Sequence, residues 1–406
     1  MIHPSQIQIK DYTYTLPEER IAKYPLAQRD ESKLLVYKNS SIVEDVYLNL
    51  ANHLPENALL VFNNTKVVHA RIFFETATGA KVEVFCLEPA EGNTEMAQVM
   101  SSTQSVHWKC MVGRASKWKE KLLTKTVDNF TLTAELIDRI PDAFIVEFTW
   151  QPANLTFAEI LDKAGVMPIP PYLKRDADEI DLARYQTVFA KYEGSVAAPT
   201  SGLHFTQRVL DSLKQKNILS AEVTLHVGAG TFKPVKSETM QDHEMHAELI
   251  DVTTETLQTL INNTDGNIIA VGTTSLRTIE SLYWMGVKAL HNPMCVLHEL
   301  EIKQWDAYDS LQSETPSTKL ALNALLNWIQ RNNHSRIICK TQIIIAPPYK
   351  LKVATALATN FHQPNSTLLL LVAAVIGNKW KEVYNYAMQH NFRFLSYGDG
   401  SLLFAE

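Results

Sequence analysis

The sequence is poor in cysteine, with four among 406 residues. They lie far apart in the chain, at Cys86, Cys110, Cys295 and Cys339. No pair has the C-x-x-C spacing of a zinc ribbon or a thioredoxin-type site, which argues against both classes. Free thiols in a reducing cytosol are therefore expected.

Long hydrophobic runs are also missing. The longest, at residues 368–376, is too short to cross a bilayer core of about 30 Å and predicts a buried helix instead. Residues 1–25 are polar and mixed in charge, without the apolar core of a signal peptide. We therefore expect a cytoplasmic protein with no membrane partner.

The chain has no excess of positive charge. Lys and Arg number 38 against 44 Asp and Glu, which gives a formal net charge of -6 and argues against bulk electrostatic capture of nucleic acid. A local basic stretch is nevertheless present, flanked by Trp108 and Trp118. It predicts a phosphate-contacting surface with stacking partners, and a solvated hairpin is the alternative. The cations expected to contact RNA are Lys109, Arg114, Lys117 and Lys119.

Length and periodicity predict two domains. A chain of 406 residues exceeds what one core usually supports, and 46% hydrophobic with 20% charged residues is typical of a globular protein. Between residues 67 and 150, short runs alternate polar and apolar residues, as half-buried antiparallel strands do. From residue 156 onward, helical and strand patterns alternate, as in an α/β domain with parallel strands. We therefore expect an α/β domain formed by residues 1–66 and 151–406, interrupted by a small all-β barrel domain at residues 67–150.

The same patterns predict the individual elements. Helices are expected at residues 157–163, 206–216, 254–262, 275–284, 318–332 and 367–377. Strands are expected at residues 33–37, 58–62, 81–87, 108–112, 130–136, 143–150, 221–227, 267–271, 336–338, 341–345 and 393–397. Residues 91–103 are polar and small, and we expect an exposed loop there.

Two segments near the middle of the chain combine glycine with histidine. Residues 194–205 read GSVAAPTSGLHF, and residues 225–232 read LHVGAGTF. Glycine tolerates left-handed backbone and lets the main chain approach a ligand closely. His226 would end a strand, where α/β folds bind ligands, and His204 would precede a helix capped by Thr206. We interpret both segments as walls of a small-molecule pocket, and two structural histidines at ordinary turns are the alternative.

Two further turns carry polar residues. Residues 271–274 join a strand to a helix, where free amides suit an anion, and Arg277 could add a bidentate clamp on a carboxylate. Asn360 and His362 precede the apolar helix and could hydrogen-bond the edge of a heterocycle. Ordinary helix capping is the alternative in both places.

Acidic residues and histidines gather in two other places. Residues 242–248, DHEMHAE, hold three possible metal ligands but lack the H-E-x-x-H spacing of a zinc protease. We favour an acid–base cluster or a solvated segment over a metal site, and so expect no metal. Asp399 lies between two glycines, where it could neutralise a cation or act as a base, and a local Asx-turn is the alternative.

These segments run in order along almost the whole chain. Together they resemble the S-adenosylmethionine:tRNA ribosyltransferase-isomerase family of queuosine biosynthesis. The matching pieces are residues 11–17, 21–25, 63–67, 168–172, 184–188, 194–206, 225–232, 245–248, 272–277, 359–364 and 396–399. The chain departs from the family pattern at Ser201, at Leu249 and at Gly400-Ser401, where Ala, an aromatic residue and Ala-Met are usual.

The resemblance implies a fold and a reaction. The family has a barrel-like α/β domain with an inserted β-barrel domain. Its enzymes place the ribosyl part of S-adenosylmethionine on 7-aminomethyl-7-deazaguanine at the tRNA wobble position, which gives epoxyqueuosine-tRNA and releases adenine and methionine. S-adenosylmethionine is then a consumed substrate and no cofactor is expected. The partners implied are this tRNA and S-adenosylmethionine, and we expect a monomeric enzyme.

The reaction needs a base for the 5′ C–H beside the sulfonium, an acid for adenine and deprotonation of the attacking amine. The candidate catalytic residues are His204, His226, His246, Glu248 and Asp399. The candidate substrate-binding residues are Thr200, Gly202, Gly228, Gly230, Thr273, Thr274, Arg277, Asn360, His362 and Tyr397. Of these, the turn at Thr273 with Arg277 would hold the methionine carboxylate, and Asn360 with His362 would line the adenine site.

Three other functions fit the sequence less well. A methyltransferase would carry an acidic, glycine-rich loop after its first strand, which this chain lacks. A non-catalytic RNA-binding module would need a stronger basic surface than the net charge of -6 suggests. A metal hydrolase would need better ligand spacing than residues 242–248 provide.

Overall fold

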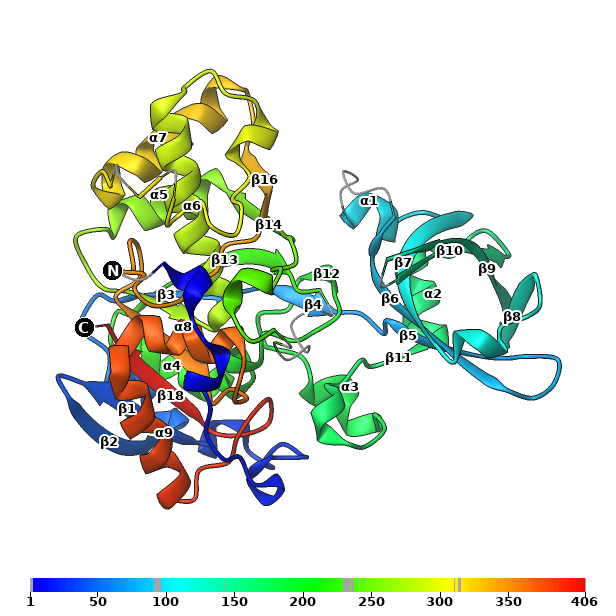
Figure 1. The fold of residues 1–406 in the computed structure, drawn as a ribbon, viewed down its shortest axis with the longest axis horizontal. Helices are drawn as coiled ribbons and strands as arrows, with labels where there is room; N and C mark the ends of the chain where they lie inside the picture. Colours follow the sequence, from blue (N-terminus) through cyan, green and yellow to red (C-terminus); the bar gives the residue numbers. More distant parts are fainter. Residues whose placement is uncertain are drawn as a thin grey trace.

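A nine-stranded mixed sheet forms the centre of the larger body of the molecule (Figure 1). The structure is a computed structural model that describes residues 3–90, 96–141, 143–228, 235, 237–309, 311–312 and 315–405. The strand order is β16 (Arg336–Thr341), β14 (Glu248–Thr253), β13 (Leu219–His226), β3 (Leu59–Asn63), β15 (Ile268–Val271), β17 (Ala356–Asn360), β18 (Gly400–Phe404), β1 (Lys33–Lys38) and β2 (Ser41–Val46). Of these, β13, β3, β15 and β17 are parallel. β3, β15 and β17 are buried along their whole length, as strands covered on both faces are.

The prediction of a parallel sheet is therefore confirmed in part, for the four central strands and for the pair of β1 with β18. β18 runs antiparallel to β17, and β14 runs antiparallel to both of its neighbours. β1 and β2 form a hairpin whose turn residues, Asn39 and Ser40, have φ of 50° and 59°, which matches the twist of paired strands. The mixed α/β class is confirmed. The described strands form a sheet with two edge strands, β16 and β2, so they do not show a closed barrel, and the barrel-like closure stays a prediction.

Helices are present at all six predicted positions. They are α2 (Phe157–Ala164), α4 (Gln207–Gln215), α5 (Thr254–Asn262), α6 (Thr273–His291), α7 (Thr318–Arg331) and α8 (Thr367–Ile376). Thr206, Thr253 and Ser366 start α4, α5 and α8 by accepting a hydrogen bond from the amide three positions later. α8 is apolar and buried, as predicted from its sequence, and no helix in the described part of the chain is both long and apolar enough to span a membrane. Two helices of this body were not predicted, α3 (Glu179–Arg184) and α9 (Trp380–Gln389).

Two predicted strands are wrong. At residues 393–397, Leu395 has φ of 69°, which an extended strand cannot hold, and β18 begins only after this turn. Beyond Thr341, residues 342–345 leave the sheet. The carbonyls of Ile343 and Ile344 accept hydrogen bonds from Arg277 and Tyr308 side chains there, in place of a strand partner.

A second sheet forms the lobe at the right of Figure 1. Its seven strands are antiparallel, in the order β11 (Gly165–Val166), β5 (Arg71–Glu75), β6 (Lys81–Pro89), β7 (Ser105–Gly113), β10 (Ala143–Gln151), β9 (Phe130–Ile140) and β8 (Leu122–Val127). Antiparallel strands are present here as expected, and along β7 and β9 buried residues alternate with exposed or half-buried ones, whereas the all-β character of the insert stays a prediction. Closure into a barrel stays a prediction, because the hydrogen-bonded order of the described strands has two ends.

Two helices pack with this lobe. α2 follows the predicted boundary at residue 150, yet Phe157 lies in the core of the lobe, against Trp108 and Trp150. The predicted loop at residues 91–103 is wrong in part, because α1 (Met96–Met100) buries Met96 and Met100 in the same core. Residues 91–95 of that predicted loop lie outside the described residues. The remaining short pair, β4 (Thr65–Val67) with β12 (Tyr192–Ser195), lies between body and lobe in Figure 1.

Candidate active site

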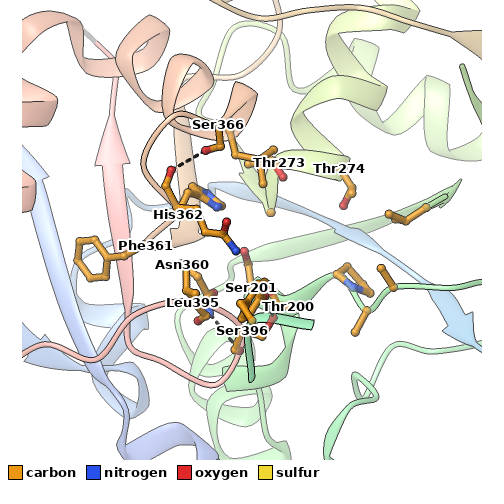
Figure 2. A pocket seen from close by; sticks show the side chains of 18 residues that line it. Thr200, Ser201, Thr273, Thr274, Asn360, Phe361, His362, Ser366, Leu395 and Ser396 are labelled. Carbon is orange, nitrogen blue, oxygen red and sulfur yellow. Dashed lines mark hydrogen bonds between the residues drawn. The ribbon is translucent and has the colours of Figure 1, made fainter. Parts of the chain in front are cut away.

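A pocket opens at the carboxyl ends of β13, β15 and β17, where an α/β sheet commonly binds its ligand. Residues 197–201, 272–274, 360–363 and 395–396 enclose it, and it holds about 790 Å³ including the part open to solvent. Figure 2 shows these side chains converging from separate segments. We call this space the main pocket. Of the predicted binding residues, it brings together Thr200, Thr273, Thr274, Asn360 and His362.

The start of α6 faces this pocket without a capping side chain. Its N-cap is Gly272, whose φ of 90° few other residues adopt, and no side chain of a described residue accepts from the first amides. Thr273 and Thr274 line the pocket directly. The hydroxyls of Thr274 and Ser275 are buried, and neither has a hydrogen-bond partner among the described residues. Free amides, the Thr274 hydroxyl and the positive end of the helix dipole together form a site for a carboxylate or another anion.

Arg277 lies one turn further along α6 and is 7% exposed. Its Nη1 donates to the carboxylate of Glu248, and its Nε donates to the Ile343 carbonyl at 3.2 Å. The structure therefore brings Arg277 and Glu248 together as a buried ion pair, and neither lines the main pocket. The pair fixes the first turn of α6 against β14, so it acts on the anion site through the position of the helix.

His204 does not line the main pocket; it lies buried behind Asn360. The Asn360 amide donates to the carbonyls of Leu395 and Ser396, at 2.9 and 3.3 Å, so its oxygen is left to accept. That oxygen lies 3.1 Å from His204 Nε2, which must then carry the proton, while Nδ1 lies 2.6 Å from Ser32 Oγ. Burial lowers the pKa of His204 to about 4, so the ring is neutral near pH 7. His204 therefore positions Asn360, which itself lines the pocket.

His362 reaches the main pocket with one ring nitrogen available. Nε2 lies 2.9 Å from Thr359 Oγ1, and Nδ1 has no hydrogen-bond partner among the described residues. Burial lowers its pKa to about 4, so the neutral ring can donate or accept one hydrogen bond to a ligand. The preceding residue, Phe361, turns its ring away from the pocket in Figure 2 and packs on Tyr384 and Phe394.

His226 faces a second pocket, on the side of the lobe. This pocket holds about 1050 Å³ including open space, and α1, β12, β13, β14 and β16 contribute its lining. Burial lowers the pKa of His226 to about 4, and its Nδ1 lies 3.5 Å from Thr65 Oγ1. The next residue, Val227, lines the main pocket. The end of β13 therefore separates the two pockets, with His226 on one side and Val227 on the other.

The other predicted catalytic residues lie apart from both pockets. His246 is exposed, in a segment without helix or strand. Asp399 accepts from the amides of Lys33 and Arg393, at 3.0 and 2.8 Å, and from the Arg393 guanidinium at 2.9 Å, so its carboxylate holds the turn before β18. No group of three or more metal-ligating side chains gathers anywhere in the described ranges.

Of the remaining predicted binding residues, two have packing roles, one has open space around it and one lies outside the described residues. Tyr397 donates to Asp181 at 2.7 Å, away from the main pocket. A side chain at Gly202 would meet Thr187 at 2.9 Å, so its small size serves packing. Gly228 has open space around it, and Gly230 lies outside the described residues.

The predicted RNA surface is exposed at three of its four cations: Arg114, Lys117 and Lys119. Lys109 instead pairs with Glu88 at 2.8 Å. The expectation that the neighbouring tryptophans offer stacking faces is wrong, because Trp108 and Trp118 are only 2% and 9% exposed.

Two residues at or beside the pocket were not predicted individually. Ser275 lies buried next to it with a free hydroxyl, and it could have been found, because it directly follows Thr274 in the strand–turn–helix motif. Ser396 lines the pocket and hydrogen-bonds Tyr172 at 2.5 Å, a contact across 224 positions that no local pattern signals.

Fold and site together define a class: a two-lobed, mixed α/β protein with an anion site at its sheet edge and a second pocket beside its β lobe. The sequence profile of the queuosine biosynthesis protein family matches residues 9–403, and the chain belongs to that family.

Relatives of known name align over nearly the full length of the chain. The S-adenosylmethionine:tRNA ribosyltransferase-isomerase of Pelobacter propionicus is 35% identical over 401 residues, which cover 97% of this chain and 99% of the relative. The enzymes of the same name from Thermotoga petrophila and Aquifex aeolicus are 36% and 34% identical, each over 98% of this chain and 100% of the relative. A solved structure, S-adenosylmethionine tRNA ribosyltransferase from Thermotoga maritima, is 26% identical with a TM-score of 0.45 and covers 97% of this chain and 99% of that one.

Proposed function

We propose that this chain transfers and isomerises the ribosyl moiety of S-adenosylmethionine onto 7-aminomethyl-7-deazaguanine at the tRNA wobble position. The products are epoxyqueuosine-tRNA, adenine and methionine. The observation that carries this function is the family match over residues 9–403, with relatives of that name aligned along the whole chain. S-adenosylmethionine is consumed as a substrate, and the proposal includes no cofactor and no metal.

S-adenosylmethionine occupies the main pocket in this proposal. Its carboxylate lies at the uncapped start of α6, where the Thr274 and Ser275 hydroxyls are buried without partners among the described residues. Its adenine lies toward His362, whose free Nδ1 can hydrogen-bond a ring nitrogen. Asn360 contributes less directly, because His204, Leu395 and Ser396 already occupy its amide group.

The RNA base approaches from the second pocket, so that the amine and the ribose meet at the end of β13. His226 lies in the second pocket, one residue from the wall of the main pocket at Val227. Its pKa of about 4 leaves the ring unprotonated near pH 7, so it can accept a proton from the 5′ carbon or from the attacking amine. Among the predicted catalytic residues, His226 is therefore the one we assign to proton transfer.

The other predicted catalytic groups act by position. His204 holds Asn360, Glu248 holds Arg277, and Asp399 holds the turn before β18. His246 is exposed, and we assign it a contact with the RNA.

The proposal extends to the organisation of the enzyme. A discontinuous catalytic domain, residues 1–66 and 151–406, carries the main pocket, and residues 67–150 form a barrel domain against which α2 packs. The exposed cations Arg114, Lys117 and Lys119 of that domain contact tRNA phosphates, with Lys109 beside them. The enzyme works as a monomer in the cytoplasm.

The test is an incubation of the full chain with S-adenosylmethionine and tRNA that carries 7-aminomethyl-7-deazaguanine, followed by mass analysis of the products. Adenine and methionine released in equal amounts, with a matching mass gain on the tRNA, are expected. S-adenosylhomocysteine would mean methyl transfer instead. No turnover by a folded sample would leave an RNA-binding protein as the function.

A further inference from the structure

A small cavity lies directly behind the main pocket, and Ser396 lines both. It holds about 290 Å³ including open space. Three arginines from distant parts of the sequence line it: Arg29, Arg184 and Arg393. We call it the arginine pocket. None of these arginines belongs to the predicted tRNA surface, and none has a role in the reaction as proposed above.

The positive charge of this pocket is only partly neutralised. Arg393 pairs with Asp399 at 2.9 Å. Arg29 donates to the carbonyls of Gln186 and Ala183, at 3.0 and 3.4 Å. Arg184 donates to the carbonyls of Ala27, at 3.1 Å, and of Leu26. Arg29 and Arg184 therefore form no ion pair with a carboxylate among the described residues. Carbonyl oxygens carry no net charge, so these contacts do not neutralise the two guanidinium groups.

The carboxylates next to this pocket are already engaged. Asp30 accepts from Arg208 at 2.9 and 3.0 Å and from Thr206 at 2.6 Å. Asp181 accepts from both Nη atoms of Arg175, at 2.6 and 2.8 Å, and from Tyr397. Neither forms an ion pair with Arg29 or Arg184, although the charge of the adjacent Asp30 partly offsets that of Arg29.

Two further observations indicate a missing anion. The Nε of Arg184 is buried and has no hydrogen-bond partner among the described residues, although a buried unpaired donor is unfavourable. Burial lowers the pKa of Arg29, and the charge of Arg184 lowers it further, so the two cations repel each other across the pocket. An anion between them would relieve both.

We infer that the arginine pocket binds a phosphate group, and specifically a phosphodiester of the RNA strand next to the reacting nucleotide. Converging guanidinium groups match the oxygens of a phosphate bidentately. In the proposed function the carboxylate of S-adenosylmethionine lies at the start of α6, which lines the main pocket and not the arginine pocket. In a chain of net charge -6, phosphate attraction must come from local clusters of this kind. The choice of RNA as the source rests on the proposed function, whereas the binding of phosphate does not.

The competing explanation is structural. Arg29 and Arg184 each bond carbonyls of the other's segment, and this reciprocal clasp could serve only to hold residues 26–29 against the end of α3. The two explanations differ in the effect of added phosphate, which a purely structural clasp would not respond to.

The first experiment uses inorganic phosphate as the probe. The melting temperature of the full chain is measured against phosphate concentration at constant ionic strength, with chloride as the reference. We expect a saturable increase for the natural protein. Arg184→Gln and Arg184→Lys should abolish or weaken it, Lys being included because it keeps the charge but loses the bidentate geometry. The control is Arg331→Gln, an exposed arginine that likewise donates to a backbone carbonyl.

The second experiment identifies the source of the phosphate. In steady-state assays, Arg184→Gln should raise KM for tRNA about tenfold, with kcat and KM for S-adenosylmethionine unchanged. The slope of log KM against log salt should fall by about 0.7, the value for one phosphate contact on single-stranded RNA. Phosphate protection with unchanged tRNA kinetics would overturn the assignment to RNA and leave a free-anion site. No saturable protection of the natural protein would overturn the site altogether.

A failure of the proposed function would give a different pattern. The natural protein would then release no adenine, while phosphate would still protect it and Arg184→Gln would still remove that protection.

Discussion

The hydroxyl of Thr274 allows a test in which binding and stability respond differently. It is buried at the anion site without a partner among the described residues. Thr274→Val removes it and keeps nearly the same shape. In the free protein nothing is lost by this change, since the hydroxyl makes no hydrogen bond there. In the complex a hydrogen bond to the carboxylate of S-adenosylmethionine is lost.

The two effects have different magnitudes. A hydrogen bond to a charged group contributes about 1.5–3 kcal/mol, so binding of S-adenosylmethionine should weaken roughly 10- to 150-fold. An unsatisfied buried polar group costs about 1–3 kcal/mol, part of which the valine recovers. The free energy of unfolding without ligand should therefore stay the same or rise, by at most about 1 kcal/mol.

The assay combines urea unfolding of the free protein with KM for S-adenosylmethionine. The control is Thr278→Val, one turn further along α6, where the hydroxyl is buried but bonded to the Thr274 carbonyl at 2.9 Å. This variant should lose about 1 kcal/mol of stability and keep its KM. If Thr274→Val unfolds more easily and binds S-adenosylmethionine normally, the anion site at α6 is refuted.

Three further results are expected. The pKa of His226 is about 4 in the folded chain and near 6.5 in the unfolded chain, so on acidification the unfolded state binds the proton first. The free energy of unfolding should therefore be highest above about pH 6.5 and fall by up to about 3 kcal/mol as the pH drops toward 4. Unfolding measured at several pH values should show a smaller fall for His226→Gln. His204→Phe leaves the Asn360 oxygen without its donor and should lower stability by about 1–3 kcal/mol while raising KM for S-adenosylmethionine, and an unchanged KM would contradict its positioning role. Exchanging Lys117 and Lys119 for Gln should raise KM for tRNA at low salt and leave KM for S-adenosylmethionine unchanged. The slope of log KM for tRNA against log salt concentration should fall by about 1.4–1.8.

The sequence predicted elements best where local chemistry decides them. Thr253 caps α5 and Ser366 caps α8, and both helices have nearly the predicted bounds. The apolar run of α8 could only be buried. β17 was missed because its sequence, ALATN, is short and rich in small residues, so its burial in the sheet comes from neighbours and not from β-propensity.

The site was predictable as a set of turns but not as a set of contacts. The glycine at the start of α6 and the polar residues after it signal an anion site within one motif. The role of His204 depends on its contact with Asn360, 156 positions later in the chain, and no sequence pattern near either residue predicts that contact. The same limit applies to Arg277 on α6, whose partner Glu248 lies 29 positions earlier on strand β14.

The position of β18 has a consequence for how this chain reaches its native state. Among the described strands, the hairpin of β1 and β2 joins the nine-stranded sheet only through β18, since β1 pairs with residues 400–403 on one side and with β2 on the other. Residues 33–46 leave the ribosome early, yet their place in the sheet exists only after residue 400 has been made. Such distant pairing slows folding, because a very long loop must close first. In the lobe, the strands from β5 to β10 pair with strands that are close in the sequence. The lobe can therefore fold during synthesis, before the hairpin of β1 and β2 joins its sheet.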